Sequence, residues 1–411
     1  MRKVDKMQEI QKFDCAINGG GMIGATCALS LAQLGLTVAI IEKNEPQPFS
    51  IEQPLDLRVS AISLASQQLL AQLGAWQQVS QWRNCPYQRL GVWEKSFAYT
   101  EFNAKEINQS HLGHIVENRL LQLSLWQELK KNKNITLFCP QSLKSFKQGN
   151  NVVELLLEES KLQVKLLIAA DGANSKVREL ANIGITGWDY QQSAMLINVK
   201  TQLPQQNITW QQFLPTGPMA MLPMPQATNE SALADSKYQG VASLVWYHHR
   251  DEIARLNMLS NEQLSSEIMG VFPKRLGKIK VMNKGSFGLT RRHANQYQNR
   301  QILLLGDAAH TINPLAGQGV NLGFKDVKAL QNVIAEAIGN GECWHNEAVL
   351  SRYEKARRAD NLLMMSAMDS LYFSFSHPSS LIKSIRNTVL SLTNKIPFIK
   401  NKVLRHACGL D

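Results

Sequence analysis

The chain has 411 residues, of which 44% are hydrophobic and 19% are charged, as in ordinary globular proteins of about two domains. Its formal net charge of +11 suits a nucleic acid, an anionic membrane surface or an anionic ligand. No basic run interleaved with stacking aromatic residues is present, so we exclude nucleic acid as a partner.

The cysteines and the hydrophobic runs bear on the compartment. The six cysteines show no CxxC pair and no metal-ligand spacing, so we expect reduced thiols and no metal site. Residues 1–13 lack the apolar stretch of a signal peptide, and no apolar run approaches the ~18 residues of a transmembrane helix. The sequence therefore predicts a cytoplasmic protein without a membrane span.

The first elements in chain order form a predicted βαβ unit. Residues 13–18 have the pattern of a strand, residues 25–34 that of a helix, and residues 37–41 that of a second strand. Asn18 ends the first strand, where an apolar residue would bury better, and nothing in the sequence explains it. A βαβ unit that starts a chain is typical of dinucleotide-binding proteins.

The turn of this unit carries the GxGxxG spacing. Gly19 permits the tight turn, Gly21 lets a pyrophosphate approach the backbone, and Gly24 lets the helix pack closely on the strand. Glu42 follows the second strand, where it can bind the ribose hydroxyls of an adenosine, and we include the adjacent Lys43 in the site. An acid at this position favours FAD or NAD over NADP.

Two arginines between residues 55 and 130 are candidate cofactor contacts. Arg58 covers a cofactor phosphate or pairs on the surface, and the sequence favours neither alternative. Asn118 and Arg119 stand at the start of a predicted helix over residues 119–129. There they contact a cofactor or, in the case of Asn118, simply cap the helix.

A second turn from strand to helix follows the buried run at residues 163–169. It contains Asp171 and Gly172. One interpretation is a helix capped by Asp171 or Asn174. Beside a dinucleotide fold, a cofactor contact is the alternative, and we include Asp171 and Gly172 in the predicted site.

The region from residue 194 to residue 289 changes to short, alternating, strand-like runs, interrupted by a helical piece at residues 261–272. This pattern predicts a mostly antiparallel sheet. Its aromatic residues wall a pocket for an apolar ring or form ordinary sheet core, and both interpretations stay open: Trp210, Phe213, Trp246 and Tyr247.

A third turn from strand to helix joins an apolar run at residues 302–305 to a predicted helix at residues 324–337. Asp307 stands where the strand ends and can accept hydrogen bonds from ligand hydroxyls. Pro314 stiffens the loop, and the glycines let backbone approach a flat ligand. The helix start offers amide groups and a positive dipole end to an anion. The predicted cofactor-binding residues of this segment are Gly306, Asp307, Gly319, Val320 and Asn321.

The last segment, residues 351–411, is predicted to be helical, and it becomes basic and apolar toward its end. A basic amphipathic surface of this kind binds anionic lipid in some proteins. More often it is a helix with one face on the core and the other in solvent.

One extended FAD accounts for all three turns. Its adenosine would lie at Glu42, its pyrophosphate at the GxGxxG turn, its ribitol at Asp307 and its flavin ring at residues 314–321. We found no second fingerprint, so a nicotinamide donor would bind without a domain of its own. The predicted fold class is α/β (α+β overall): a Rossmann-like FAD-binding domain (1–82, 106–187 and 290–350), an inserted β-sheet substrate domain (83–105 and 188–289), and a C-terminal helical segment (351–411).

With these three turns the chain resembles the para-hydroxybenzoate-hydroxylase-like single-component flavin monooxygenases over nearly its whole length. Shorter phrases resemble the branch of ubiquinone-biosynthesis ring hydroxylases: Asp56 to Ser63, Trp210 to Pro218, Ser243 to Tyr247 and Leu289 to Ala294. The resemblance implies hydroxylation of a polyprenylated benzoquinol, at the last ring hydroxylation, with NAD(P)H or another electron donor and O2 as co-substrate.

The resemblance also implies a mechanism. Reduced flavin would react with dioxygen to a C4a-hydroperoxide, and the electron-rich ring would take its distal oxygen. The residues implied to border this chemistry are Pro314, Gly317, Gln318 and Gly319. His293 and His310 are candidate bases by residue type only, and structural roles are the favoured interpretation.

The implied partners follow from the substrate. A polyprenyl tail resides in a bilayer, so a peripheral contact with the inner face of the membrane, or with a ubiquinone-biosynthesis protein complex, is an open alternative for the basic tail. Three other functions also stay open: a sister polyprenylphenol hydroxylase, a non-catalytic FAD-bound subunit of a quinone-synthesis complex, and a reductase that works without dioxygen.

Overall fold

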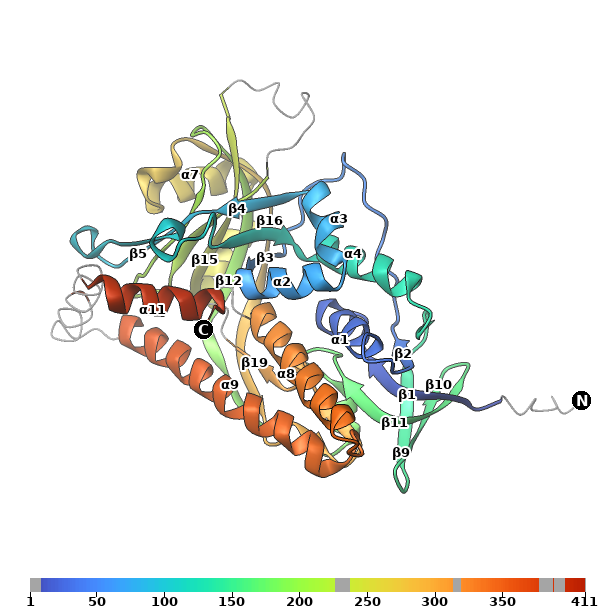
Figure 1. Ribbon diagram of the computed structural model, residues 1–411. Helices are drawn as coiled ribbons and strands as arrows, with labels where there is room; N and C mark the ends of the chain where they lie inside the picture. The colour runs from blue at the N-terminus through green and yellow to red at the C-terminus, as the bar shows by residue number, and fades with distance from the viewer. Residues whose placement is uncertain (1–8, 226–236, 313–318, 377–386, 388–395, 411) are drawn as a thin grey trace, which may run out of the picture.

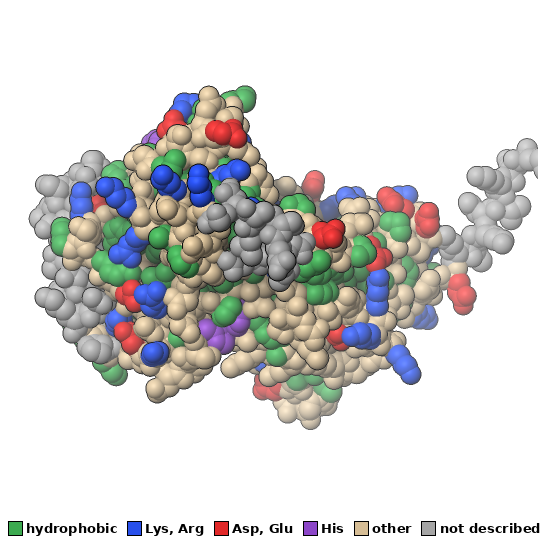
Figure 2. Space-filling model, turned by 90° about the horizontal axis from the view of Figure 1, so that it is seen from above, with side chains coloured by type: hydrophobic (Ala, Val, Ile, Leu, Met, Phe, Trp, Pro, Cys, Tyr) green, Lys and Arg blue, Asp and Glu red, His purple; other side chains and the backbone are tan. Residues whose placement is uncertain are grey.

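The computed structural model describes residues 9–225, 237–312, 319–376, 387 and 396–410. It has two sheet-containing lobes, with the long helices α8 and α9 running along one side of both (Figure 1). The N-terminal strand lies at one end of the molecule, and the chain ends beside helix α11, near the other. Figure 2 shows Lys and Arg side chains spread over one face, with hydrophobic side chains exposed between them.

The first sheet is parallel at its centre. Its strand order is β17-β18-β11-β1-β2-β8, and β10 and β9 extend it from β11. The central strands are buried apolar runs, as expected where helices cover a parallel sheet. Their bounds are β1 Gln11–Asn18, β2 Val38–Ile41, β8 Ile135–Phe138, β9 Leu143–Gln148, β10 Val153–Leu157, β11 Lys161–Ala169, β17 Gln298–Asn299 and β18 Ile302–Leu304.

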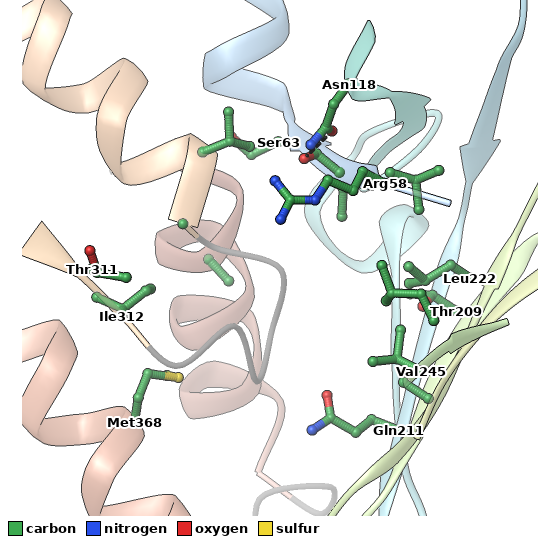
Figure 3. A pocket seen from close by; sticks show the side chains of 18 of the residues that line it. Arg58, Ser63, Asn118, Thr209, Gln211, Leu222, Val245, Thr311, Ile312 and Met368 are labelled. Carbon is green, nitrogen blue, oxygen red and sulfur yellow. Dashed lines mark hydrogen bonds between the residues drawn. The ribbon is translucent and has the colours of Figure 1, made fainter. Parts of the chain in front are cut away.

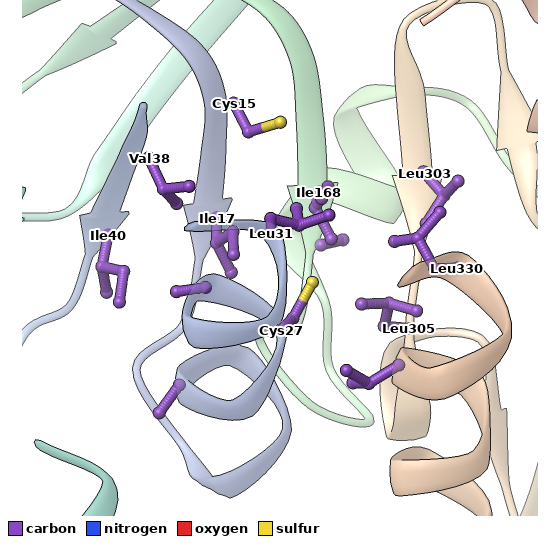
Figure 4. Packing of buried hydrophobic residues seen from close by; sticks show 14 of the residues in the cluster. Cys15, Ile17, Cys27, Leu31, Val38, Ile40, Ile168, Leu303, Leu305 and Leu330 are labelled. Carbon is purple, nitrogen blue, oxygen red and sulfur yellow. The ribbon is translucent and has the colours of Figure 1, made fainter. Parts of the chain in front are cut away.

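Helix α1 (Met22–Ala32) lies against the centre of this sheet and is buried along most of its length. Figure 4 shows Cys27 and Leu31 of α1 beside Ile17 of β1 and Ile168 of β11. Small residues on α1 allow this close packing. Neighbouring helices cover the rest of the core: α4 (Asn118–Lys131), α8 (Gly319–Gly339) and α9 (Glu347–Ser376).

A small antiparallel sheet joins the two lobes, with strand order β3-β7-β4. Its strands are β3 Val59–Ser63, β4 Asn84–Tyr87 and β7 Gly113–Glu117. Between β3 and β4 the chain forms α2 (Leu64–Gln72) and α3 (Ala75–Gln81). Strand β3 follows Arg58 and leads directly into α2. Its last residue is hydrogen-bonded to α8 near the start of that helix, so the small sheet lies beside α8.

The third sheet is large, with strand order β19-β16-β12-β15-β14-β13-β5-β6. Its pairs are antiparallel except for β13 with β5. Helices α6 (Arg250–Met258) and α7 (Asn261–Val271) cover one face and enclose a core of Trp, Met and Leu side chains. Its strands are β5 Arg89–Trp93, β6 Thr100–Asn103, β12 Ile185–Thr201, β13 Ile208–Gln212, β14 Met219–Pro223, β15 Gly240–His249, β16 Ile279–Ala294 and β19 His310–Thr311.

The remaining elements are short turns of helix and the last helix. They are η1 Ser96–Ala98, η2 Ala104–Ile107, α5 Lys176–Leu180, η4 Lys274–Leu276, η5 Gly306–Ala308 and α11 Pro397–Cys408. Within the described ranges, no helix combines the length and hydrophobicity needed to cross a bilayer.

The predicted fold class is confirmed: a Rossmann-like parallel sheet, a mostly antiparallel second sheet and C-terminal helices are all present. The predicted domain boundaries stay a prediction. Asn118 does not cap its helix, because it lies inside the first turn of α4, whose N-cap is Glu117. Helix α6 is an element that the sequence pattern did not predict.

Candidate active site

The turn between β1 and α1 has the geometry that its glycines predict. Gly19 has φ +107°, a value that side chains other than glycine rarely adopt, and a Cβ atom on Gly24 would overlap the carbonyl oxygen of Gly19. Gly21 is the N-cap of α1 and would have open space in front of a Cβ atom. Gly21 lines a cavity, so the amide end of α1 faces that cavity.

The side chain of Glu42 fixes this turn by hydrogen bonds to its backbone. Its carboxylate accepts hydrogen bonds from the backbone amides of Gly20 and Lys43, both at 2.7 Å. The indole of Trp126 donates to the carbonyl of Gly20 at 2.7 Å, so both backbone polar groups of Gly20 are held by side chains. The side chain of Lys43 is exposed. Neither Glu42 nor Lys43 lines the cavity, and their contact with an adenosine stays a prediction.

Asn18, which nothing in the sequence explained, binds the second predicted turn. Its amide donates to the Oδ2 atom of Asp171 at 2.9 Å, so it cross-links the ends of the neighbouring strands β1 and β11. The same oxygen accepts from the amides of Lys176 and Val177 at the start of α5. The N-cap of α5 is Ser175, not Asp171 or Asn174, yet Asp171 satisfies two of its free amides.

Of the two residues predicted at this turn, Gly172 lines the cavity, with φ +82°, and Asp171 does not. The Oδ1 atom of Asp171 is buried and has no hydrogen-bond partner within the part of the chain that the structure describes. An acceptor of this kind is costly to bury unless a donor from a ligand or water reaches it.

Asp307 lies in the third turn, directly after β18. Gly306 has φ +54° and starts the 3-10 turn that carries Asp307. Protein surrounds Asp307, yet its side chain is accessible because it faces the cavity. Burial raises the pKa of Asp307, and the nearby groups of His310 and Arg58 oppose that shift.

A second acid, Asp326 on α8, holds this turn in place. It is fully buried, and its carboxylate accepts from the amide of Gly306 at 3.1 Å, from His310 at 2.6 Å and from Arg357 at 2.8 Å. Asn361 donates to it at 3.2 Å. Burial raises the pKa of Asp326, but His310 and Arg357 outweigh that effect and lower it to about 2. Arg357 and Asn361 come from α9, so α9 supports the turn that carries Asp307.

The two histidines considered as bases are hydrogen-bonded to other protein side chains. His310 pairs with Asp326, and the Nε2 atom of His293 lies 2.9 Å from the hydroxyl of Tyr297. Burial lowers the pKa of His293 to about 4, so its ring is neutral near neutral pH. Neither ring belongs to the lining of the cavity formed by the described residues.

Of the candidate contacts between residues 55 and 130, Arg58 and Asn118 line the cavity and Arg119 does not. Figure 3 shows the guanidinium of Arg58 pointing into the cavity. Asn118 accepts a hydrogen bond from the hydroxyl of Ser60 at 2.7 Å. Arg119 lies 3.4 Å from Asp56, in a half-exposed ion pair.

Helix α8 begins at the cavity. Gly319 and Val320 line it, and a Cβ atom on Gly319 would have open space around it. Asn321 is buried, accepts from Ser63 and Ser66, and donates to the carbonyl of Ala61. It therefore fastens β3 and α2 to α8. Pro314, Gly317 and Gln318 lie outside the described residues.

The cavity itself has a volume of about 1030 Å³ and runs between the three turns and the large sheet. Figure 3 shows Thr209, Gln211 and Val245 of the sheet facing Met368 of α9 across it. Among the predicted aromatic residues, Phe213 and Tyr247 line the cavity. Trp210 also borders it, but its ring is buried with Trp246 in the core behind the sheet, where both rings contact Phe272.

Comparison with known proteins agrees with this geometry. The model of an FAD binding domain family matches residues 12–366. The chain is 44% identical to 3-demethoxyubiquinol 3-hydroxylase of Escherichia coli (strain K12) over 97% of this chain and 99% of that one. It is 32% identical to ubiquinone hydroxylase UbiL of Rhodospirillum rubrum, over 96% and 89%. The chain belongs to the FAD-dependent monooxygenases of the ubiquinone-hydroxylase branch.

A solved structure supports the fold alone. The crystal structure of p-nitrophenol 4-monooxygenase PnpA from Pseudomonas putida DLL-E4 has a TM-score of 0.77 and 17% identity, over 97% of this chain and 98% of that one. The shared fold includes both sheets, since the match spans nearly the whole of each chain.

The described residues fit FAD. Two helix starts, at Gly21 and Gly319, face one cavity with open space in front of them, as the diphosphate and ring system of the cofactor require. Asp307 and the free oxygen of Asp171 offer acceptors for cofactor hydroxyl or amide groups. The cavity is also larger than FAD's flavin ring alone needs, which leaves the sheet side for a substrate.

Proposed function

We propose that this FAD-dependent monooxygenase hydroxylates the ring of a 2-polyprenyl-3-methyl-6-methoxy-1,4-benzoquinol, the last ring hydroxylation of ubiquinone biosynthesis. The identity of 44% to 3-demethoxyubiquinol 3-hydroxylase, over nearly the whole of both chains, supports this substrate. NAD(P)H is the proposed electron donor and O2 the co-substrate.

The observation that carries the proposal is the continuity of one cavity. Its polar end has Arg58, Asp307 and the start of α8, and its other wall is the apolar face of the large sheet. An aromatic ring placed against the sheet would therefore lie beside a cofactor placed against the turns. Such placement accounts for much of the catalysis in this kind of reaction.

Gln211 is the residue best placed to orient the ring. Figure 3 shows its amide pointing from β13 into the cavity. Its Nε2 atom is buried and has no hydrogen-bond partner among the described residues. A ring oxygen of the quinol would satisfy this donor, and a ring without an oxygen there would leave it unpaired.

The protein's other contributions are binding and electrostatics. FAD, when bound, supplies the activation of dioxygen and the oxygen atom that enters the ring. The amide end of α8 at Gly319 would stabilise negative charge on the bound cofactor, as an oxyanion hole does. The apolar sheet wall, with Leu222 and Val245, keeps water away from the reacting atoms.

The test uses the FAD-loaded protein, NADH or NADPH, and a demethoxyubiquinol analogue under isotopically labelled dioxygen. We expect a product heavier by one labelled oxygen atom, together with quinol-stimulated oxidation of the nicotinamide. Oxidation that continues without dioxygen would indicate a reductase. No oxidation under any condition would favour the non-catalytic subunit.

The position of the reaction is tested in the host. Deletion of the gene should cause accumulation of the methylated quinone precursor that lacks one methoxy group. Accumulation of an earlier polyprenylphenol would assign the protein to a sister hydroxylation instead.

We also propose a peripheral contact with the inner face of the membrane through α11. On this helix Phe398 is 79% exposed, and Lys402 and Arg405 are exposed. Apolar and basic side chains together favour anionic lipid. Phe398→Asp with Lys402→Glu should abolish binding to anionic vesicles while retaining activity on a tail-less quinol. Unchanged vesicle binding would leave a protein complex as the alternative partner.

A further inference from the structure

The cavity extends past the ring region to the two C-terminal helices. We propose that this extension, the C-terminal arm, binds the first isoprene units of the substrate's tail and leads the rest of the tail to the surface beside α11. The arm is defined by Leu112, Met368, Phe375, Val403, Leu404 and Cys408, all of which line the cavity. The inference rests on the proposed function, because only a prenylated substrate has a tail to place.

Helix α11 forms one wall of the arm and is held firmly. Leu404 and Cys408 are 2% and 4% exposed and pack with Leu112 and neighbouring apolar residues. Lys400 pairs with Glu106 at 2.8 Å, which fixes the start of the helix against the large-sheet lobe. The wall is therefore part of the folded protein, not a loose segment near the cavity.

Helix α9 forms the opposite wall. Phe375 stacks on Phe213 of the sheet region, with ring centroids 3.9 Å apart and planes 10° apart. Nearly two turns before the stack, Asp369 pairs with Arg291 of β16 at 2.8 Å. The hydroxyl of Tyr190 donates to the same carboxylate. These contacts fix α9 against the sheet, so Met368 and Phe375 keep their positions in the wall.

The arm has the chemistry of an isoprenoid site. The six residues that define it are uncharged and mostly apolar, whereas Arg58 and Asp307 lie at the other end of the cavity. Val403 lines the cavity and is also 50% exposed, so the arm reaches the surface there. A flexible apolar chain buries its methyl and methylene groups in such a space, while the polar ring stays near the cofactor end.

The test compares substrates that differ only in the tail. Val403→Trp narrows the mouth of the arm, and His406→Trp, an exposed neighbour on the same helix that does not line the cavity, is the matched control. For a decyl-substituted demethoxyquinol, Val403→Trp should lower kcat/KM by at least about tenfold, as the lost burial of roughly two methylene groups would. For a tail-less quinol the change should stay within about twofold. His406→Trp should behave as the wild type with both.

A second measurement does not depend on turnover. A quinone with a photoreactive group on its prenyl chain should label peptides of α9 and α11 in the FAD-loaded protein, and an unlabelled long-chain quinone should compete. If Val403→Trp does not fold, Ala407→Leu, a milder change in the same wall, takes its place and should reduce the labelling. Labelling without hydroxylation would retain the arm and refute the proposed function.

Three results would contradict the proposal that the C-terminal arm binds the tail. One is labelling confined to other elements. The second is an equal loss for long-tailed and tail-less quinols in Val403→Trp, and the third is no loss for either.

Discussion

The turns at the end of the parallel sheet and the wall of the large sheet face the same cavity but are built in different ways. At the turns, backbone groups do the binding. Gly19 is required by its φ angle and Gly24 by close packing, while Gly21 leaves open space for a ligand. At the sheet, side chains do the binding, and Tyr247 of β15 lines the cavity while its neighbour Trp246 packs into the core.

The difference teaches where function can be read from sequence. Backbone recognition needs particular residues at fixed spacings, so it leaves a motif. A side-chain wall needs only apolar residues with the right facing, and these are the same residues that fill a core. The cofactor-binding turns of this protein can therefore be predicted from the sequence, whereas the substrate wall of the large sheet cannot.

The largest expected effect separates two glycines of one motif. Gly24→Val should prevent accumulation of folded protein, because even a Cβ atom there overlaps the carbonyl of Gly19. Gly21→Val should fold normally, since nothing lies within 4 Å of its Cβ position, but should lose FAD. Expression yield, circular dichroism and flavin absorbance measure both. A folded, flavin-loaded Gly21→Val protein would contradict the fingerprint.

The next effect separates two acids near the third turn. Asp326→Ala should lower the free energy of unfolding by about 3–5 kcal/mol, because it leaves Arg357 and His310 without their buried partner. Urea titration measures this loss. Asp326→Asn, which retains the shape but not the charge, should fall between the wild type and Asp326→Ala. A variant as stable as the wild type would show that the network contributes little.

Asp307→Ala should show the opposite pattern. Burial raises the pKa of Asp307, which means that the folded protein disfavours its charge, so removing it should leave stability unchanged. Loss of a hydrogen bond that a cofactor hydroxyl donates to this charged acceptor should weaken FAD binding by about 1.5–3 kcal/mol, or roughly ten- to hundredfold in Kd. Full flavin occupancy at low FAD concentration would contradict the ribitol assignment.

On the sheet side, Gln211→Leu should raise the KM for the quinol and lower kcat/KM by about five- to tenfold, the cost of one hydrogen bond. Its FAD content should not change, since Gln211 lies on β13 and not at the turns. Steady-state kinetics with flavin quantification tests this. Weaker flavin binding in Gln211→Leu would remove the distinction between the two walls.

The smallest effect concerns pH. Burial lowers the pKa of His114 to about 4, and the nearby His111 adds to the shift. Between pH 6.5 and about 4 the unfolded chain takes up a proton at this ring and the folded protein does not, so stability falls as pH falls. His293 behaves in the same way in the large sheet. Thermal unfolding across this range should show a shallower slope in His114→Phe than in the wild type.

The sequence was sufficient for the parallel sheet, the three turns and the C-terminal helices, because each depends on local spacing. It was not sufficient for Asp326, whose partner Arg357 lies 31 residues away on another helix. Asn18 looked anomalous for the same reason, since its partner Asp171 is 153 residues away. Long-range polar pairs of this kind have no periodicity, and only the folded chain brings them together.

The Asp326 network also sets an order of events during synthesis. The fingerprint glycines leave the ribosome first, but the sheet that positions them needs β11 and β18, and the Gly306 turn needs Arg357 and Asn361 of α9. A nascent chain that ends before α9 therefore has the nucleotide motif without a finished receptor for the flavin. We therefore expect cofactor loading to follow the folding of α9, and a chain truncated before α9 should bind no flavin.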